Sequence, residues 1–231
     1  MRLPCAPVTS AHRTNQDMAE ERTVSTRTDY VKTSLDEGEA GMDPVRLFMA
    51  WLDEAQQQGL PDHNAMVLST VGSLSLSSRV VLLRQVDGRG FSFFTNYNSR
   101  KAMDLERDPR ASLLFHWPTL ERQVRVEGRA ERLPVEESDA YFASRPRESR
   151  VGAWCSDQSR MVEDRSAIEE RFKRWSERFE GMEVPRPDHW GGLLVRPVRI
   201  ELWQGRANRL HDRLAYERFG DGSWQRMRLQ P

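Results

Sequence analysis

Short β-rich runs follow one another almost directly through this 231-residue sequence, and their order constrains the fold more than any other feature. A doubly wound parallel sheet needs a helix after nearly every strand, whereas tight turns can join antiparallel strands. Turn residues such as Asp87-Gly88 separate several of the runs. The sequence therefore predicts a mainly β, antiparallel sheet or barrel with peripheral helices (α+β). We expect strands at residues 65–71, 79–86, 91–95, 112–117, 123–132, 193–203, 207–216 and 224–229.

Four helices are expected around this sheet. Asp43-Pro44 supplies an N-cap followed by proline at the first helical position, and apolar residues then recur at helical spacing as far as Gly59. A short helix is predicted from Arg100 to Glu106, after a capping Ser99. The other two helices are predicted between Pro134 and Pro146 and from Asp164 onward.

The first 40 residues are polar and lack apolar periodicity, so they are predicted to form a flexible N-terminal arm. Residues 41–231 are expected to fold as one domain. No apolar signal core or stretch of the ~20 apolar residues needed to span a membrane is visible. The two cysteines, Cys5 and Cys155, suit a reducing compartment, and a cytoplasmic location is expected.

Charge and motif content argue against several classes of function. Lysine plus arginine number 35, as do aspartate plus glutamate, so no global field favours nucleic acid or an anionic membrane. The five histidines are scattered and no Cys-x-x-Cys is present, so the sequence pattern argues against a metal site. The glycine-rich phosphate loops and the Gly-x-Ser-x-Gly elbow are also missing. Phosphate groups would therefore have to be bound by side chains.

Arginines in strand or strand-end contexts are the remaining candidates for anion binding, because the guanidinium fork matches phosphate. If the segment after Trp203 is extended, Arg209, His211 and Arg213 share one face. That face could line a binding site. It could equally be an exposed strand whose basic residues discourage edge pairing.

A set of short sequence motifs, taken in order, resembles the pyridoxine (pyridoxamine) 5'-phosphate oxidase family over roughly residues 43 to 231. The resemblance implies an FMN-binding split β-barrel that forms a homodimer with flavin at the subunit interface. The motifs that carry the resemblance are Arg79-Val80-Val81-Leu82-Leu83-Arg84, Phe93-Phe94-Thr95-Asn96, Ser99-Arg100-Lys101, Arg122-Gln123-Val124, Gln158-Ser159, Trp203, Arg209-Leu210-His211, Arg213 and Arg228-Leu229-Gln230-Pro231.

The same resemblance implies oxidation of pyridoxine or pyridoxamine 5'-phosphate to pyridoxal 5'-phosphate, with O2 reduced to H2O2. Arg209 and His211 would face the substrate ring as the catalytic pair. Further substrate-binding residues would be Arg84, Tyr141, Arg145 and Ser149, with Arg27 and Tyr30 from the arm. FMN would be held by Arg79, Val80, Val81, Leu82, Phe94, Thr95, Arg100, Lys101, Gln123, Gln158, Ser159, Trp203 and Arg213.

Two departures from the family pattern leave alternatives open. Arg84 stands where the family usually has a lysine, and the hairpin at residues 72–78 lacks the usual Asp- and Gly-containing turn. One alternative is another split-barrel protein, such as a flavin- or deazaflavin-dependent reductase or a haem-binding relative. A second is a non-catalytic protein that binds pyridoxal phosphate or FMN.

Overall fold

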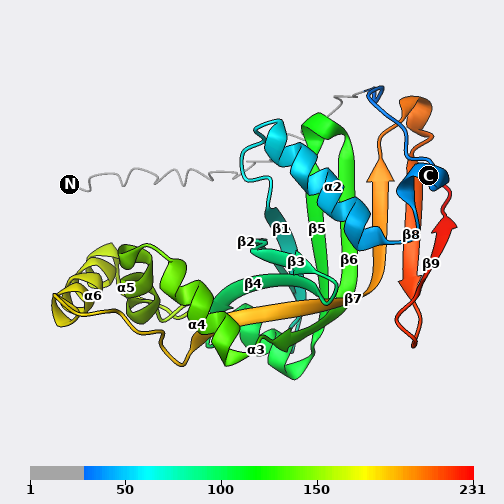
Figure 1. Cartoon of the computed structure of the whole chain (residues 1–231). Coiled ribbons are helices and arrows are strands. Elements are labelled where there is room, and N and C mark those ends of the chain that lie inside the picture. Colours follow the sequence, from blue (N-terminus) through cyan, green and yellow to red (C-terminus); the bar gives the residue numbers. More distant parts are fainter. Residues whose placement is uncertain (1–28) are drawn as a thin grey trace, which may run out of the picture.

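The computed structural model describes residues 29–231, in which a nine-stranded sheet curls into a barrel-like body (Figure 1). Every strand pairing is antiparallel. The prediction of a mainly β, antiparallel fold with peripheral helices is therefore confirmed. The strands are β1 (Ala65–Val71), β2 (Leu76–Leu82), β3 (Gln85–Asp87), β4 (Gly90–Asn96), β5 (Arg110–Trp117), β6 (Arg122–Arg132), β7 (Trp190–Gln204), β8 (Asp212–Arg218) and β9 (Trp224–Arg228).

Strand β7 organises the sheet because its two halves pair with different neighbours. The sheet order is β2-β1-β5-β6-β7-β4-β3. The first half of β7 pairs with β4, the second half pairs with β8, and β6 runs alongside almost its whole length. A register shift at Glu127/Gly128 of β6 accompanies this change of partner, as expected where a sheet bends. One strand thus connects two separate regions of the sheet.

Helix α2 (Pro44–Gln57) covers one face of the barrel and supplies much of its core (Figure 1). The Asp43 side chain caps it by accepting from the backbone N–H of Val45 and Arg46. Phe48 is fully buried, and its ring centroid lies 4.7 Å from that of Phe115 and 4.9 Å from that of Phe91. The helical spacing of apolar residues after Asp43 therefore correctly predicted the face that α2 buries.

The remaining helices lie outside the sheet. Helices α4 (Val135–Ser144), α5 (Arg147–Cys155) and α6 (Arg165–Arg178) form a lobe beside the first half of β7 (Figure 1). Helix α3 (Arg100–Arg107) follows β4, and α1 (Glu37–Ala40) is a single turn. Between residues 29 and 231, no helix is both long and apolar enough to cross a bilayer.

Three local predictions are corrected by the structure. The chain expected as one strand at 79–86 divides into β2 and β3, and Arg84 lies at the break. Helix α5, which directly follows Pro146, was not predicted. The strand expected at 207–216 begins only at Asp212, because Asn208 and Arg209 adopt positive φ angles of 56° and 62° in a turn.

The structure describes only the last part of the N-terminal arm expected at residues 1–40. Residues 29–40 pack against the sheet, and the Leu35 side chain is buried. Asp36 caps helix α1 by accepting from the Gly38 N–H. Arg27, one of the two expected arm residues, lies outside the described residues.

Candidate functional site

A cavity of about 480 Å³ opens between the sheet and the lobe of α4 and α5. Its cationic side chains are Arg84, Lys101 and Arg145, and no aspartate or glutamate lines it. Such a lining favours an anionic ligand, because the cations are not neutralised within the cavity wall. The other lining residues are Val80, Val81, Leu82, Phe94, Thr95, Asn96, Tyr141, Ser149, Gly152, Ala153, Ser156, Gln158 and Trp190.

Lys101, in the first turn of α3, points its ammonium group toward neutral oxygen atoms. The Nζ atom donates to Thr95 Oγ1 at 3.2 Å, Ser99 Oγ at 3.4 Å and Gln158 Oε1 at 3.0 Å. Burial, and secondarily the nearby Arg79 charge, lowers the pKa of this ammonium group. A bound anion would relieve that penalty, because an opposite charge favours the protonated form of lysine.

Arg145 lies directly after α4 and is held by aromatic rings. Its guanidinium carbon lies 4.5 Å from the ring centroid of Trp190 and 5.5 Å from that of Phe142. The Nη1 atom is buried without a hydrogen-bond partner among residues 29–231. Burial, and to a smaller extent the Arg84 charge, lowers the pKa of Arg145. A buried donor without a partner is costly, so this atom marks a position for an acceptor from a ligand.

Aromatic stacking fixes the wall next to Arg145. The Tyr141 ring stacks on Phe94 with centroids 3.9 Å apart, and the planes of Tyr141 and Trp190 differ by 4°. The guanidinium carbon of Arg84 lies 5.9 Å from the Tyr141 ring centroid. Ser149 comes from α5, the helix that the sequence did not predict. The four residues predicted to bind the substrate phosphate, Arg84, Tyr141, Arg145 and Ser149, therefore line one cavity.

Other predicted flavin ligands lie around α3 rather than in the cavity lining. The Arg79 guanidinium donates to Leu68 O and Thr70 Oγ1, and lies 3.9 Å from Asp104 Oδ2. The Arg100 backbone N–H donates to Ser159 Oγ at 3.2 Å, which places two predicted ligands side by side. Asp104, which also accepts from Thr70, is a buried carboxylate that the sequence reading did not single out.

A second group of predicted residues lies on β6, β7 and β8 and in the turn before β8: Gln123, Trp203, Arg209, His211 and Arg213. Gln123 is opposite Trp203 in the β6–β7 pairing, and Trp203 is opposite Arg213 in the β7–β8 pairing. The His211 ring centroid lies 4.7 Å from that of Trp203. Tyr30 places its ring edge-on to both, with centroid distances of 5.6 Å to each.

Glu201, which was not among the predicted site residues, binds Arg213 of this second group. Its side chain is 4% exposed, and its Oε1 accepts from Arg213 Nε at 2.9 Å and lies 2.8 Å from Arg213 Nη2. Arg213 Nη1 donates to Gln230 O near the end of the chain. The sequence signal was a carboxylate directly between Ile200 and Leu202 in a predicted strand, because a charge buried among apolar neighbours is normally paired.

The turn before β8 shapes the surroundings of His211. Its Nδ1 atom accepts a hydrogen bond from the Arg206 backbone N–H at 3.1 Å. Burial, and then the Arg209 charge, lowers the pKa of the imidazole. Arg209 itself is exposed. The predicted alternation of Arg209, His211 and Arg213 along one strand face is wrong, because Arg209 lies in the turn and only Arg213 lies within β8.

Within one chain the two groups are not brought together. Trp190 in the cavity and Trp203 in the second group lie at opposite ends of β7, roughly 40 Å apart along the strand at the usual rise per residue. Helices α4 and α5 lie on the opposite side of the barrel from β8 (Figure 1). The cavity and the second group are thus two separate partial sites.

Comparison with known proteins identifies relatives over nearly the whole domain. Residues 52–179 match the family model described as pyridoxamine 5'-phosphate oxidase. Residues 190–231 match the model described as the pyridoxine 5'-phosphate oxidase C-terminal dimerisation region. The chain is 53% identical over 206 residues to the pyridoxine/pyridoxamine 5'-phosphate oxidase of Cupriavidus metallidurans, covering 89% of this chain and 97% of that protein. Its identity to the corresponding oxidase of Rubrobacter xylanophilus is 55%, with 89% and 94% covered.

Solved structures agree with this assignment. PhzG from Burkholderia lata, solved with tetrahydrophenazine-1-carboxylic acid, aligns with a TM-score of 0.81 and 30% identity over 87% of this chain and 99% of its own. An FMN-binding protein related to pyridoxamine 5'-phosphate oxidase from Nostoc punctiforme aligns with a TM-score of 0.65 and 16% identity over 83% of this chain and 100% of its own, which supports the fold alone. The split-barrel fold expected from the sequence is confirmed. The chain therefore belongs to the pyridoxamine 5'-phosphate oxidase family of oxidoreductases.

Proposed function

We propose that this protein is an FMN-dependent oxidase that converts pyridoxine or pyridoxamine 5'-phosphate to pyridoxal 5'-phosphate, with O2 reduced to H2O2. The observation that carries the proposal is the cavity with three cationic side chains and no acidic one, in which Arg145 Nη1 lacks a partner among the described residues. A phosphate ester supplies the acceptor oxygens that such a wall requires.

The residues around α3 fit the phosphate end of FMN. Lys101 and the neighbouring hydroxyl groups of Thr95 and Ser99 converge on one region, and Arg79 and Arg100 lie around the same helix. FMN, when bound, would accept two electrons from the substrate and pass them to O2. The protein's part is to hold the phosphate group and to exclude water from the cavity.

The substrate phosphate fits the wall formed by Arg84, Tyr141, Arg145 and Ser149. Arg145 offers a half-buried guanidinium with a buried Nη1 atom, and Trp190 and Phe142 fix its plane. This arrangement suits bidentate binding of a phosphate. Arg84, which replaces the lysine usual in the family, keeps a positive charge at the edge of the same cavity. We infer that this substitution changes the geometry of phosphate binding and preserves its charge.

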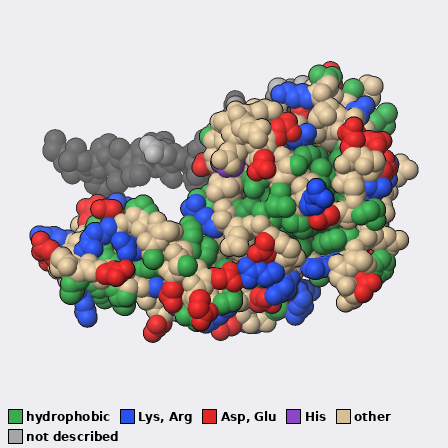
Figure 2. Space-filling model, in the orientation of Figure 1, with side chains coloured by type: hydrophobic (Ala, Val, Ile, Leu, Met, Phe, Trp, Pro, Cys, Tyr) green, Lys and Arg blue, Asp and Glu red, His purple; other side chains and the backbone are tan. Residues whose placement is uncertain are grey.

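A homodimer would complete the site. The second group, with Gln123, Trp203, Arg209, His211 and Arg213, lies far along β7 from the cavity of its own chain. The C-terminal part of the chain matches a dimerisation region. The barrel also carries exposed hydrophobic side chains (Figure 2), and Leu76 and Val80 of β2 are 77% and 65% exposed. We infer that the second group of one subunit lies over the cavity of the other.

In this arrangement Arg209 would orient the substrate ring and His211 would donate a hydrogen bond to it. Because Nδ1 of His211 accepts from the Arg206 N–H, the neutral imidazole carries its proton on Nε2. The Nε2 atom is then a donor, so a water molecule rather than His211 would accept the proton lost from the substrate. This assigns His211 to binding and orientation.

An anaerobic absorbance experiment tests the proposed function. The purified protein should be yellow, and pyridoxamine 5'-phosphate should bleach the chromophore without oxygen. Admission of air should restore the colour and release H2O2. A yellow protein that the substrate does not bleach would instead be a binding protein, and one reduced only by a nicotinamide or deazaflavin donor would be a reductase.

Replacement of Lys101 by methionine is expected to cost flavin retention. Methionine fills a similar volume but removes the ammonium group that donates to Thr95, Ser99 and Gln158. Loss of one charge-assisted contact worth about 1.5–3 kcal/mol weakens FMN binding by roughly 10-fold to 100-fold. Fluorescence titration of flavin-free protein with FMN measures this directly. Lys173→Met, at an exposed position on α6, is the matched control, and equal FMN affinity in both variants would contradict the role.

The pH dependence of turnover should reflect the lowered pKa of His211. Its folded-state pKa is below the ordinary value, so the ring stays neutral as pH falls to about 6.5. Below the lowered pKa a proton on Nδ1 would oppose the Arg206 N–H. We therefore expect kcat/KM to decrease as the pH is lowered, with an apparent pKa below 6.5. The substitution His211→Gln should remove this decrease on the acid side. An acid limb centred above 6.5 would argue against the assignment.

A further inference from the structure

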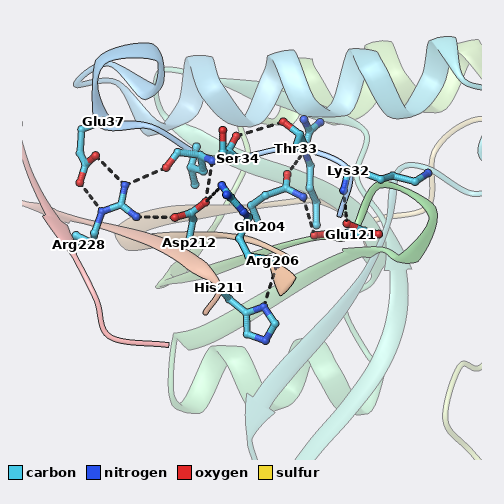
Figure 3. Close-up of polar contacts among 12 residues, drawn as sticks. Lys32, Thr33, Ser34, Glu37, Glu121, Gln204, Arg206, His211, Asp212 and Arg228 are labelled. Atoms are coloured by element: carbon cyan, nitrogen blue, oxygen red, sulfur yellow. Dashed lines mark hydrogen bonds and ion pairs between the residues drawn. The ribbon is translucent and has the colours of Figure 1, made fainter. Parts of the chain in front are cut away.

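The carboxylate of Asp212 joins the Leu35 backbone to the turn that contains Arg206 and to Arg228 of β9 (Figure 3). Its Oδ2 atom accepts from the Leu35 backbone N–H at 3.1 Å and from Arg206 Nη1 at 3.0 Å. Its Oδ1 atom accepts from Arg228 Nη1 at 2.8 Å. The Asp212 side chain is 17% exposed, so these contacts are partly shielded from water and are stronger than those of a fully exposed ion pair.

Arg228 of β9 belongs to the same network of hydrogen bonds. It donates from Nε to Glu37 Oε1 at 2.5 Å and from Nη2 to Glu37 Oε2 at 2.7 Å. Its Nη2 also donates to Leu35 O at 3.0 Å. The hydrogen bond from Arg228 lowers the pKa of the Glu37 carboxyl to about 2. Both backbone groups of Leu35 are thereby bonded to side chains from the C-terminal part of the chain, as a paired strand would bond them.

The segment held in this way carries Tyr30. Its ring contacts Trp203 and His211, and Lys32 N donates to Glu121 Oε2 at 3.0 Å. A Cβ atom at Gly205 would lie 2.7 Å from the Tyr30 ring, so glycine is required for this close approach. Tyr30 is therefore closely packed against Gly205, Trp203 and His211.

Arg206 connects the same network to His211. Arg206 bonds to Asp212 through its side chain and to His211 Nδ1 through its backbone N–H. Asp212 is also the residue next to His211 in the chain. Asp212 therefore contacts the turn that leads to His211 through Arg206 (Figure 3). It also contacts the segment that carries Tyr30 through the Leu35 backbone N–H.

We propose that Asp212 is a positioning residue that fixes the Tyr30 segment and the 206–211 turn over the substrate site, with Arg228 as its anchor. Fixing the Tyr30 segment and the turn in this way would reduce the ordering that substrate binding has to supply. The effect on substrate affinity rests on the proposed function, whereas the network itself is a property of the chain alone.

Asp212→Asn tests the proposal, because it keeps the shape of the side chain and removes its charge. We expect KM for pyridoxamine 5'-phosphate to rise roughly tenfold, as for one weakened charge-assisted hydrogen bond, with kcat changed much less. In the flavin-loaded protein without substrate, amide hydrogen exchange should accelerate in a peptide covering residues 30–37 and stay unchanged in β5. Asp221→Asn, in the β8–β9 turn, is the matched control and should change neither measurement.

A double-mutant cycle separates positioning from a general loss of stability. Because Asp212 acts partly through Tyr30 and partly through the turn, its effect on KM should be clearly smaller when Tyr30 is already alanine. Additive effects of the two substitutions, or unchanged exchange in residues 30–37, would overturn the proposal. If wild-type protein does not oxidise the substrate, the proposed function fails, and the hydrogen-exchange result still decides whether Asp212 holds the segment.

Discussion

Arg145→Ala should lower kcat/KM for pyridoxamine 5'-phosphate by a factor on the order of 10² to 10³, because two charge-assisted hydrogen bonds to phosphate are lost. Arg145 has a buried Nη1 atom without a partner among the described residues, and stacking on Trp190 holds its plane. FMN should remain bound, since Lys101 and its neighbours are intact. Steady-state oxygen uptake measures the loss, and flavin absorbance checks the occupancy.

The phosphate itself provides the sharpest control for this prediction. With unphosphorylated pyridoxamine, wild type and Arg145→Ala should differ little, because the contact in question does not exist. Arg178→Ala is the matched control variant, since Arg178 also stacks on a tryptophan, Trp175, but lies on α6 away from the cavity. An equal penalty with both substrates would mean that Arg145 supports the fold rather than the phosphate.

The largest gain of activity is expected from mixing two inactive variants. If the second group of one subunit lies over the cavity of the other, a dimer of one Arg145→Ala chain and one Arg209→Ala chain contains one unaltered site. Such a dimer should recover roughly half of the wild-type activity per dimer, because one of two symmetry-related sites is restored. Each variant alone should stay near its own low activity.

Co-expression with two different affinity tags allows the mixed dimer to be purified and assayed. Arg145→Ala mixed with Arg145→Ala/Arg209→Ala is the matched control, since neither site is then unaltered. If the tagged mixed dimer is obtained but remains as inactive as its parents, each chain carries its own complete site and the shared arrangement is wrong. The result therefore tests the arrangement independently of which residue binds phosphate.

The order of strands could be predicted because its causes are local. Turn residues at Asp87-Gly88 and β-rich runs without intervening helices require antiparallel neighbours, and the observed sheet has them. Asp43-Pro44 likewise marked the start of α2, whose apolar spacing predicted the buried Phe48. Helix α5 was not predicted, because it directly follows Pro146 and has no capping side chain that would mark its start.

The site was predicted less completely, for a physical reason visible at particular residues. Alternation would have placed Arg209 and His211 on one strand face, but positive φ angles at Asn208 and Arg209 form a turn instead. Glu201 became recognisable as the partner of Arg213 only through the pairing of β7 with β8.

The sequence by itself determined the alternation, the turns and the helix starts, because these depend on residues close together in the chain. Only the tertiary structure decided which charges lose water and which meet. Lys101 of α3 and Arg145, which directly follows α4, line one cavity. Leu35 bonds to Asp212 across 177 residues of sequence. Such contacts are fixed by strand register and by packing between distant segments, so no local pattern of residues specifies them.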